Sequence, residues 1–182
     1  DVDNELVKRF IETYVKPPYS IFGRNSNPSS HYIWEGSVDF KQFVLPSELK
    51  NYIKNLPHGN TLCEIRTGAG HYTIVPESQH SKANETVKWE KFCGFREYSG
   101  DLNADLRKVA LSTALCILYA PDGQRDIYCT AIAGILLKHT NWEEDEINSF
   151  VYNIAVASND SEAEKRNLKG SSGQRANRKL GM

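Results

Sequence analysis

Residues 63–80 read CEIRTGAGHYTIVPESQH, a stretch in which strand-like and turn-like segments alternate. Residues 63–66 form a short strand-like run, two glycines follow, and residues 71–75 form a second strand-like run that ends at a proline. This order predicts a β-hairpin. Polar groups at strand ends beside a glycine turn are one way in which a fold presents a functional site. The polar residues at these ends are Glu64, Arg66, Ser78 and His80.

The residues before and after this hairpin predict further small elements of an α+β fold. Residues 5–15 place apolar side chains on one helical face and are followed by two prolines, which end a helix. Residues 31–34 and 87–89 read as short strands. Residues 45–56 predict a short helix with Ser47 as its cap. We therefore expect a mixed sheet with flanking helices.

From about residue 103 the pattern is almost entirely helical, which predicts a small all-α bundle. The expected helices cover residues 104–120, residues 126–140 and a third segment beginning near Asn141, and a capping box at Ser161 and Glu164 predicts a fourth. We place the domain boundary between a sheet module of residues 1–98 and a helical domain of residues 99–182. The predicted bundle core consists of Leu111, Leu115, Leu118, Ile132, Ile135, Leu136, Ile147, Phe150, Val151 and Ile154.

Composition limits the class of protein. The chain has 182 residues, of which 40% are hydrophobic and 25% are charged, as in globular proteins. It contains neither an apolar run of the ~20 residues that span a bilayer nor an initial signal segment. Its four cysteines form no C-x-x-C pair, so we expect reduced thiols and a cytoplasmic location. Because Asp1 opens the chain without a methionine, we expect the sequence to begin inside a larger protein.

Charge is distributed unevenly, although the net charge is only −1. Residues 165–179 hold six Lys or Arg residues and no acid. Such a stretch is either a solvated tail or a contact for a polyanion such as DNA. The residues expected to contact nucleic acid are Lys165, Arg166, Lys169 and Arg175.

Two acidic patterns could hold a metal ion. Asp1 and Asp3 would point to the same side of a strand, where two carboxylates repel unless a cation lies between them. Hard divalent ions such as Mg²⁺ are held by one or two carboxylates together with substrate phosphates. Glu64 and Arg66 likewise share one face of their strand. The alternatives are a frayed acidic terminus for the first pattern and a structural cross-strand ion pair for the second.

A third pattern runs from Gly23 to His31, with the sequence GRNSNPSSH. A glycine turn leads through Arg24 to Ser29 and His31 at the start of a strand. A hydroxyl, an imidazole and a guanidinium together could bind phosphate. Turn chemistry with a surface histidine is the alternative interpretation of the same residues.

In combination and in this order, the patterns resemble the catalytic module of the primase–polymerase branch of the archaeo-eukaryotic primase superfamily. The resemblance covers residues 1–89 and is most specific in residues 23–31 and 64–80. Residues 123–160 resemble the helical domain that follows this module in plasmid and phage replication proteins. The resemblance implies a partial primase-type, RRM-like sheet followed by a helical bundle.

The resemblance also implies roles for individual residues. Asp1, Asp3 and Glu64 would hold two Mg²⁺ or Mn²⁺ ions, and with His31 they would be the catalytic residues. The third acid is often Asp in the superfamily, whereas here it is Glu64. The residues that would bind the incoming nucleotide are Arg24, Ser29, His31, Arg66, Ser78 and His80.

The implied activity is template-directed nucleotidyl transfer from nucleoside triphosphates on single-stranded DNA, as a DNA primase and polymerase of a plasmid, phage or other mobile element. Since no Walker-A loop occurs, any helicase partner would lie outside this chain. Activity is expected to need the residues that would precede Asp1. Two alternatives stay open: a non-catalytic module that binds single-stranded nucleic acid, and a metal-dependent nuclease that uses the same acids.

Overall fold

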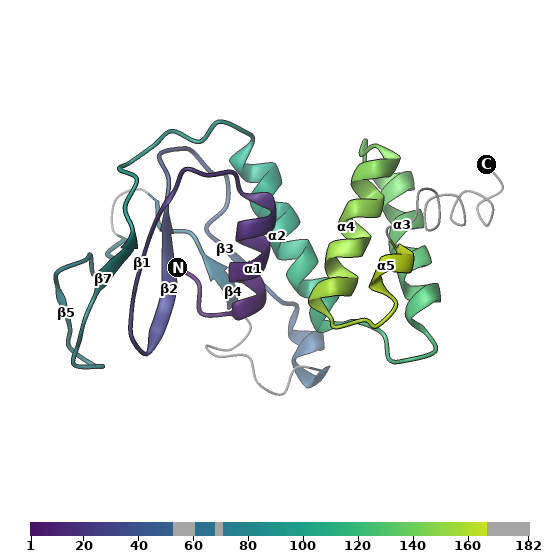
Figure 1. Cartoon of the computed structure of the whole chain (residues 1–182), viewed down its shortest axis with the longest axis horizontal. Helices are drawn as coiled ribbons and strands as arrows, with labels where there is room; N and C mark the ends of the chain where they lie inside the picture. The colour runs from purple at the N-terminus through teal and green to yellow at the C-terminus, as the bar shows by residue number, and fades with distance from the viewer. Residues whose placement is uncertain (53–60, 68–70, 167–182) are drawn as a thin grey trace. The chain divides into compact units, whose positions relative to one another are not determined.

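The computed structural model in Figure 1 describes residues 1–52, 61–67 and 71–166. The fold is α+β, as the sequence predicts. The chain divides into two compact units, a first unit of residues 1–113 and a second unit of residues 114–182. This division falls inside a helix, after the boundary expected between residues 98 and 99.

Helix α1 (Glu5–Tyr14) confirms the first predicted helix. The side chain of Asn4 caps its first turn by accepting two backbone hydrogen bonds. Val7, Phe10 and Ile11 recur at helical spacing and are almost fully buried. This apolar face provides a large share of the core of the first unit.

The first unit contains a three-stranded antiparallel sheet with the strand order β2–β1–β7. Its strands are β1 (Ser20–Arg24), β2 (Asn27–Ile33) and β7 (Lys88–Lys91). Phe22 of β1 is paired with His31 of β2 on one side and with Trp89 of β7 on the other. These three side chains therefore form one row across the sheet.

Two smaller strand pairs complete the first unit. Strand β3 (Gln42–Val44) pairs antiparallel with β4 (Thr61–Glu64), and β5 (Gln79–His80) pairs antiparallel with β6 (Glu85–Thr86). A 3₁₀-helix, η1 (Ser47–Tyr52), covers part of the helix that was predicted over residues 45–56, of which residues 53–56 lie outside the described residues.

The prediction of a β-hairpin over residues 63–75 is wrong. Residues 71–75 form no strand, and the turn at residues 68–70 lies outside the described residues. The physical reason is that both edges of β4 are already occupied. Strand β3 takes one edge, and Glu64 exchanges two backbone hydrogen bonds with Asp1, of 2.8 and 3.1 Å, on the other.

The segment of residues 1–3 is thus an additional extended piece beside the strands. The backbone N–H of Val2 donates to the carbonyl of Ser30 in β2 at 2.7 Å, while Asp1 pairs with Glu64 in β4. The segment therefore joins the three-stranded sheet to the β3–β4 pair. It places both of its aspartates between these two groups of strands.

Helices form where the C-terminal part predicts them, but the start of the fourth differs from the predicted Ser161–Glu164 box. Asp160 accepts from the N–H of Glu162, and the Glu164 carboxylate accepts from the hydroxyl of Tyr152. Helix α2 (Leu102–Ile117) contains the division between the units, and the second unit holds α3 (Arg125–His139), α4 (Glu144–Ala157) and the short α5 (Ala163–Arg166). Of the predicted core, six residues are buried: Ile132, Leu136, Ile147, Phe150, Val151 and Ile154.

The other predicted core residues are less covered. Leu111 and Ile135 are exposed, and Leu115 and Leu118 are half-buried. Ile135 falls beside the α3 face that buries Ile132 and Leu136, not on it, because successive helical residues are about 100° apart.

Four cysteines are free: Cys63, Cys93, Cys116 and Cys129. Among the helices of the described residues, none combines the length and the apolar character that crossing a bilayer requires.

Candidate functional site

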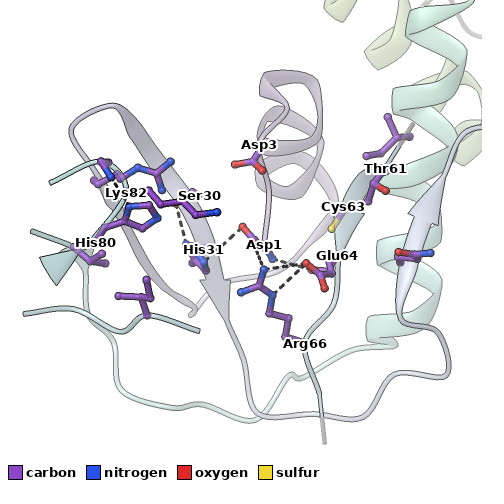
Figure 2. Close-up of a pocket in the computed structure, with 17 residues that line it drawn as sticks. Asp1, Asp3, Ser30, His31, Thr61, Cys63, Glu64, Arg66, His80 and Lys82 are labelled. Carbon is purple, nitrogen blue, oxygen red and sulfur yellow. Dashed lines mark hydrogen bonds and ion pairs between the residues drawn. The ribbon is translucent and has the colours of Figure 1, made fainter. Parts of the chain in front are cut away.

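A cavity of about 750 Å³ lies in the first unit and gathers side chains from distant parts of the sequence (Figure 2). Its walls come from residues 1–3, from β1 and β2, from β3 and β4, and from the β5–β6 pair. Seven of the residues predicted for the site line it: Asp1, Asp3, Arg24, His31, Glu64, Arg66 and His80.

Arg66 joins two of the predicted acids. One guanidinium nitrogen, Nη2, lies 2.5 Å from the Asp1 carboxylate and 3.0 Å from the Glu64 carboxylate. Arg66 also donates through Nη1 to the carbonyl of Tyr72 at 2.9 Å. The same side chain therefore pairs with two carboxylates, of which its single positive charge offsets one, and it also bonds the segment that the sequence predicted as a return strand.

His31 lies on the other side of Asp1. Its Nε2 is 3.6 Å from Asp1 Oδ1, and its Nδ1 is 2.9 Å from the hydroxyl of Ser30. Burial lowers the pKa of His31 to about 4, and the positive charges of the N-terminal amine, Arg66 and Arg24 act in the same direction, against the carboxylate of Asp3. The imidazole is therefore neutral at pH 7 and offers hydrogen bonds, not positive charge.

Asp3 and Gly23 shape the wall near β1. Asp3 accepts a hydrogen bond of 2.5 Å from the side-chain amide of Asn27. A Cβ atom at Gly23 would come within 2.7 Å of the Asn27 carbonyl and 2.8 Å of the Ser29 nitrogen. Only glycine fits where the β1–β2 hairpin comes this close, which explains the glycine of the predicted phosphate-binding stretch.

Ser30 lines the cavity in place of the predicted Ser29. Ser29 has a left-handed backbone (φ 49°), and its N–H and hydroxyl both donate to Glu90 at 2.6 Å. Ser29 is not among the residues that line the cavity, whereas Ser30 lines it and contacts His31. The left-handed residue breaks the alternation that would have put Ser29 and His31 on one side.

The Ser78–His80 segment contributes one of its two predicted residues. Ser78 pairs through its backbone with Val87 and does not line the cavity. His80 lines it, and its Nδ1 accepts a hydrogen bond of 3.1 Å from the backbone N–H of Ala83. A neutral His80 then carries its proton on Nε2.

The expected basic surface at the end of the chain is only partly described. Lys169 and Arg175 lie outside the described residues. Lys165 is exposed and paired with Glu162. Arg166 is buried against Asp126 and Asp160, which removes it from the exposed surface that the charge pattern suggested.

Sequence reasoning missed several residues of the cavity wall. Lys82 follows His80 by two residues and could have been found as a third cation beside the predicted phosphate groups. Gln42 and Thr61 reach the wall only because β3 pairs with β4, and no local pattern signals that pairing.

The cavity holds oxygen ligands of the kind that the implied metal ions need. Carboxylate oxygens of Asp1, Asp3 and Glu64 are the hard ligands that Mg²⁺ and Mn²⁺ prefer, and all three line one cavity. Within the described residues, however, no group of three or more His, Cys, Asp or Glu side chains is spaced to hold a metal ion. The chemistry of the ligands fits, and the positive charge between Asp1 and Glu64 comes from Arg66.

No protein-family model, curated protein or solved structure matches this chain. The interpretation of the cavity therefore depends on its own residues.

Proposed function

We propose that the cavity binds a nucleoside triphosphate together with Mg²⁺ or Mn²⁺ and belongs to a DNA primase–polymerase that transfers nucleotides on a single-stranded DNA template. The observation that carries this proposal is the lining of the cavity. Three carboxylates, Asp1, Asp3 and Glu64, and three basic side chains, Arg24, Arg66 and Lys82, line one space. A metal–triphosphate complex presents both kinds of partner, because its cations need carboxylates and its phosphates need basic groups.

Each side chain has a role that its position supports. Asp1, Asp3 and Glu64 would hold the metal ions, which, when bound, activate the attacking 3′-hydroxyl and stabilise the leaving pyrophosphate. Arg24 and Lys82 would bind phosphate oxygens. His31, which is neutral, would donate or accept a hydrogen bond and not supply charge. Arg66 would release its carboxylates when divalent cations arrive and turn toward the triphosphate.

The proposal includes the partners and the location expected from the sequence. The template would be single-stranded DNA, and a replicative helicase domain would act from outside this chain. A cytoplasmic location agrees with the four free thiols.

The decisive experiment measures Mn²⁺-dependent binding of a nucleoside triphosphate to the full chain by titration calorimetry. We expect binding that requires Mn²⁺ and weakens at least tenfold in Glu64→Gln and in Asp3→Asn, each of which removes one charge and keeps the shape. The matched control is Glu162→Gln, which changes an exposed carboxylate in the second unit.

Other outcomes would replace the proposal. Triphosphate binding that is independent of Mn²⁺ and of Glu64 would indicate a non-catalytic binding module. Cleavage of DNA without added nucleotide, lost in Glu64→Gln, would indicate a metal-dependent nuclease. No triphosphate binding by the wild-type chain would overturn the assignment of the cavity.

A further inference from the structure

A row of aromatic rings crosses the β2–β1–β7 sheet from the cavity wall to the sheet edge. His31, which lines the cavity, stacks on Phe22 with ring centroids 4.4 Å apart. Phe22 is fully buried and meets the ring of Trp89 edge-on at 5.3 Å. Since β7 is an edge strand of this sheet (Figure 1), the row connects the cavity to the margin of the sheet.

Two more rings continue this row into solvent. The Phe92 ring lies 4.7 Å from that of Trp89 and 6.4 Å from that of Phe95. Phe92 is 59% exposed and Phe95 is 64% exposed. Exposed aromatic rings that contact one another form a binding patch more often than they stabilise a core, because most of their apolar surface stays in water.

Near these rings, three basic residues, Lys88, Lys91 and Arg96, outnumber two acidic ones, Glu90 and Glu97. The segment 88–96, KWEKFCGFR, contains three basic residues and one acid. Lys88, Lys91 and Arg96 are all exposed. The acid, Glu90, accepts the N–H and the hydroxyl of Ser29, so its charge is used within the sheet. The exposed aromatic patch therefore lies in positive surroundings.

We propose that Phe92 and Phe95, with Lys88 and Arg96, form a binding surface for single-stranded DNA. Unpaired bases stack on exposed aromatic rings, and the backbone phosphates bind lysine and arginine. A protein partner would need an apolar surface with acidic groups around it, whereas single-stranded DNA supplies flat rings and regularly spaced negative charges together. The role of this surface in holding a template rests on the proposed function, but the binding itself does not.

The test compares two ligands by fluorescence anisotropy on the full chain. One is a labelled oligothymidylate of about twelve nucleotides, within the usual site size. The other is an abasic strand of equal length, which keeps the phosphates and lacks the bases. We expect Phe92→Ala and Phe95→Ala each to weaken oligothymidylate binding roughly five- to a hundredfold and to leave abasic binding unchanged. Ile127→Ala, at another exposed apolar residue, is the matched control and should change neither affinity.

A second pair of variants tests the phosphate contacts. Lys88→Gln and Arg96→Gln should weaken binding of both ligands and reduce the salt dependence of the affinity by about one unit of slope each. The proposal is overturned if the wild-type chain does not bind oligothymidylate, or if Phe92→Ala with Phe95→Ala leaves its affinity unchanged.

Triphosphate binding in the same variants separates this surface from the cavity. The Phe92 and Phe95 variants should keep Mn²⁺-dependent triphosphate binding, and Glu64→Gln should keep oligothymidylate binding. If the wild-type chain binds oligothymidylate but not the triphosphate, the proposed function is rejected. If it binds the triphosphate but not oligothymidylate, the DNA surface is rejected.

Discussion

Both units contain a cluster of carboxylates around an arginine, and the two clusters differ in their exposure. In the first unit, Arg66 joins Asp1 and Glu64 at a cavity wall, and the three side chains are 17–41% exposed. In the second unit, Arg166 joins Asp160 and Asp126, and the side chains of Arg166 and Asp160 are only 6% and 1% exposed.

In the buried cluster, the carboxylate of Asp160 has several hydrogen-bond and ion-pair partners. One oxygen of Asp160 accepts from the hydroxyl of Tyr119 at 2.8 Å, and the other accepts from the N–H of Glu162 at 3.0 Å. Arg125 and Arg166 lie 3.3 and 3.4 Å away. These contacts tie α5 and the preceding turn to α3, so we interpret the cluster as structural.

The difference shows how the same chemistry serves two purposes. Water cannot take the place of the partners of a buried arginine. Its charge must therefore stay paired with carboxylates for the unit to fold. At an open cavity, water and incoming ions can take the place of either partner, so Arg66 can exchange carboxylates for phosphates at small cost. Exposure, not residue type, distinguishes the candidate site from the structural cluster.

The largest loss of stability is expected for Asp160→Ala. It leaves the buried Arg166 without its central partner, and the second unit should lose about 3–5 kcal/mol of stability. Faster amide hydrogen exchange throughout α3 and α4 would report this loss. Glu162→Ala is the control, because its carboxylate is half-exposed and 3.8 Å from Arg166, and it should cost less than about 1 kcal/mol. Equal effects of both variants would break the distinction between the clusters.

Lowering the pH should destabilise the second unit by less than Asp160→Ala does. Burial acts to raise the pKa of Asp160, but hydrogen bonds from Glu162 and Tyr119 and the charges of Arg166 and Arg125 outweigh it and lower this pKa. A carboxyl whose pKa is lower in the folded state stabilises the fold above its unfolded pKa. This contribution should be present above about pH 4 and lost as the pH falls through the folded pKa.

Unfolding of the second unit measured from neutral pH down to about pH 2 checks this dependence. Asp160→Asn should remove the part of the acid sensitivity that this carboxyl causes. An unchanged pH profile in Asp160→Asn would mean that other carboxyls control the acid unfolding.

The smallest effect on stability is expected for Arg66→Ala, at the exposed cluster. The first unit should lose less than about 1 kcal/mol, because water can solvate Asp1 and Glu64. Affinity for Mn²⁺ alone should rise roughly tenfold, about 1.4 kcal/mol, since the internal positive charge no longer competes for the carboxylates. Thermal unfolding and Mn²⁺ calorimetry measure the two quantities. A loss near 3 kcal/mol with unchanged Mn²⁺ affinity would show that this cluster is as structural as the buried one.

Local sequence determined the elements whose residues interact with close neighbours. The helices were predictable because 3.6-residue periodicity acts within a few positions, as the buried face of α1 with Val7 and Phe10 shows. The convergence of Asp1 and Asp3 on one side of an extended segment was predictable for the same reason. The glycine turn expected at Gly23 was wrong, because Gly23 lies inside β1 and residues 25–26 form the turn.

Only the tertiary structure decided which residues these elements meet. Strand β4 could not pair with residues 71–75 because Asp1 and β3 occupy its two edges, and both partners are distant in sequence. The choice of Ser30 over Ser29 depends on Glu90, which holds Ser29 in a left-handed conformation. The burial of Arg166 depends on Asp160 in the same way. Edge availability and charge pairing are set by packing across the chain, and a local pattern cannot encode them.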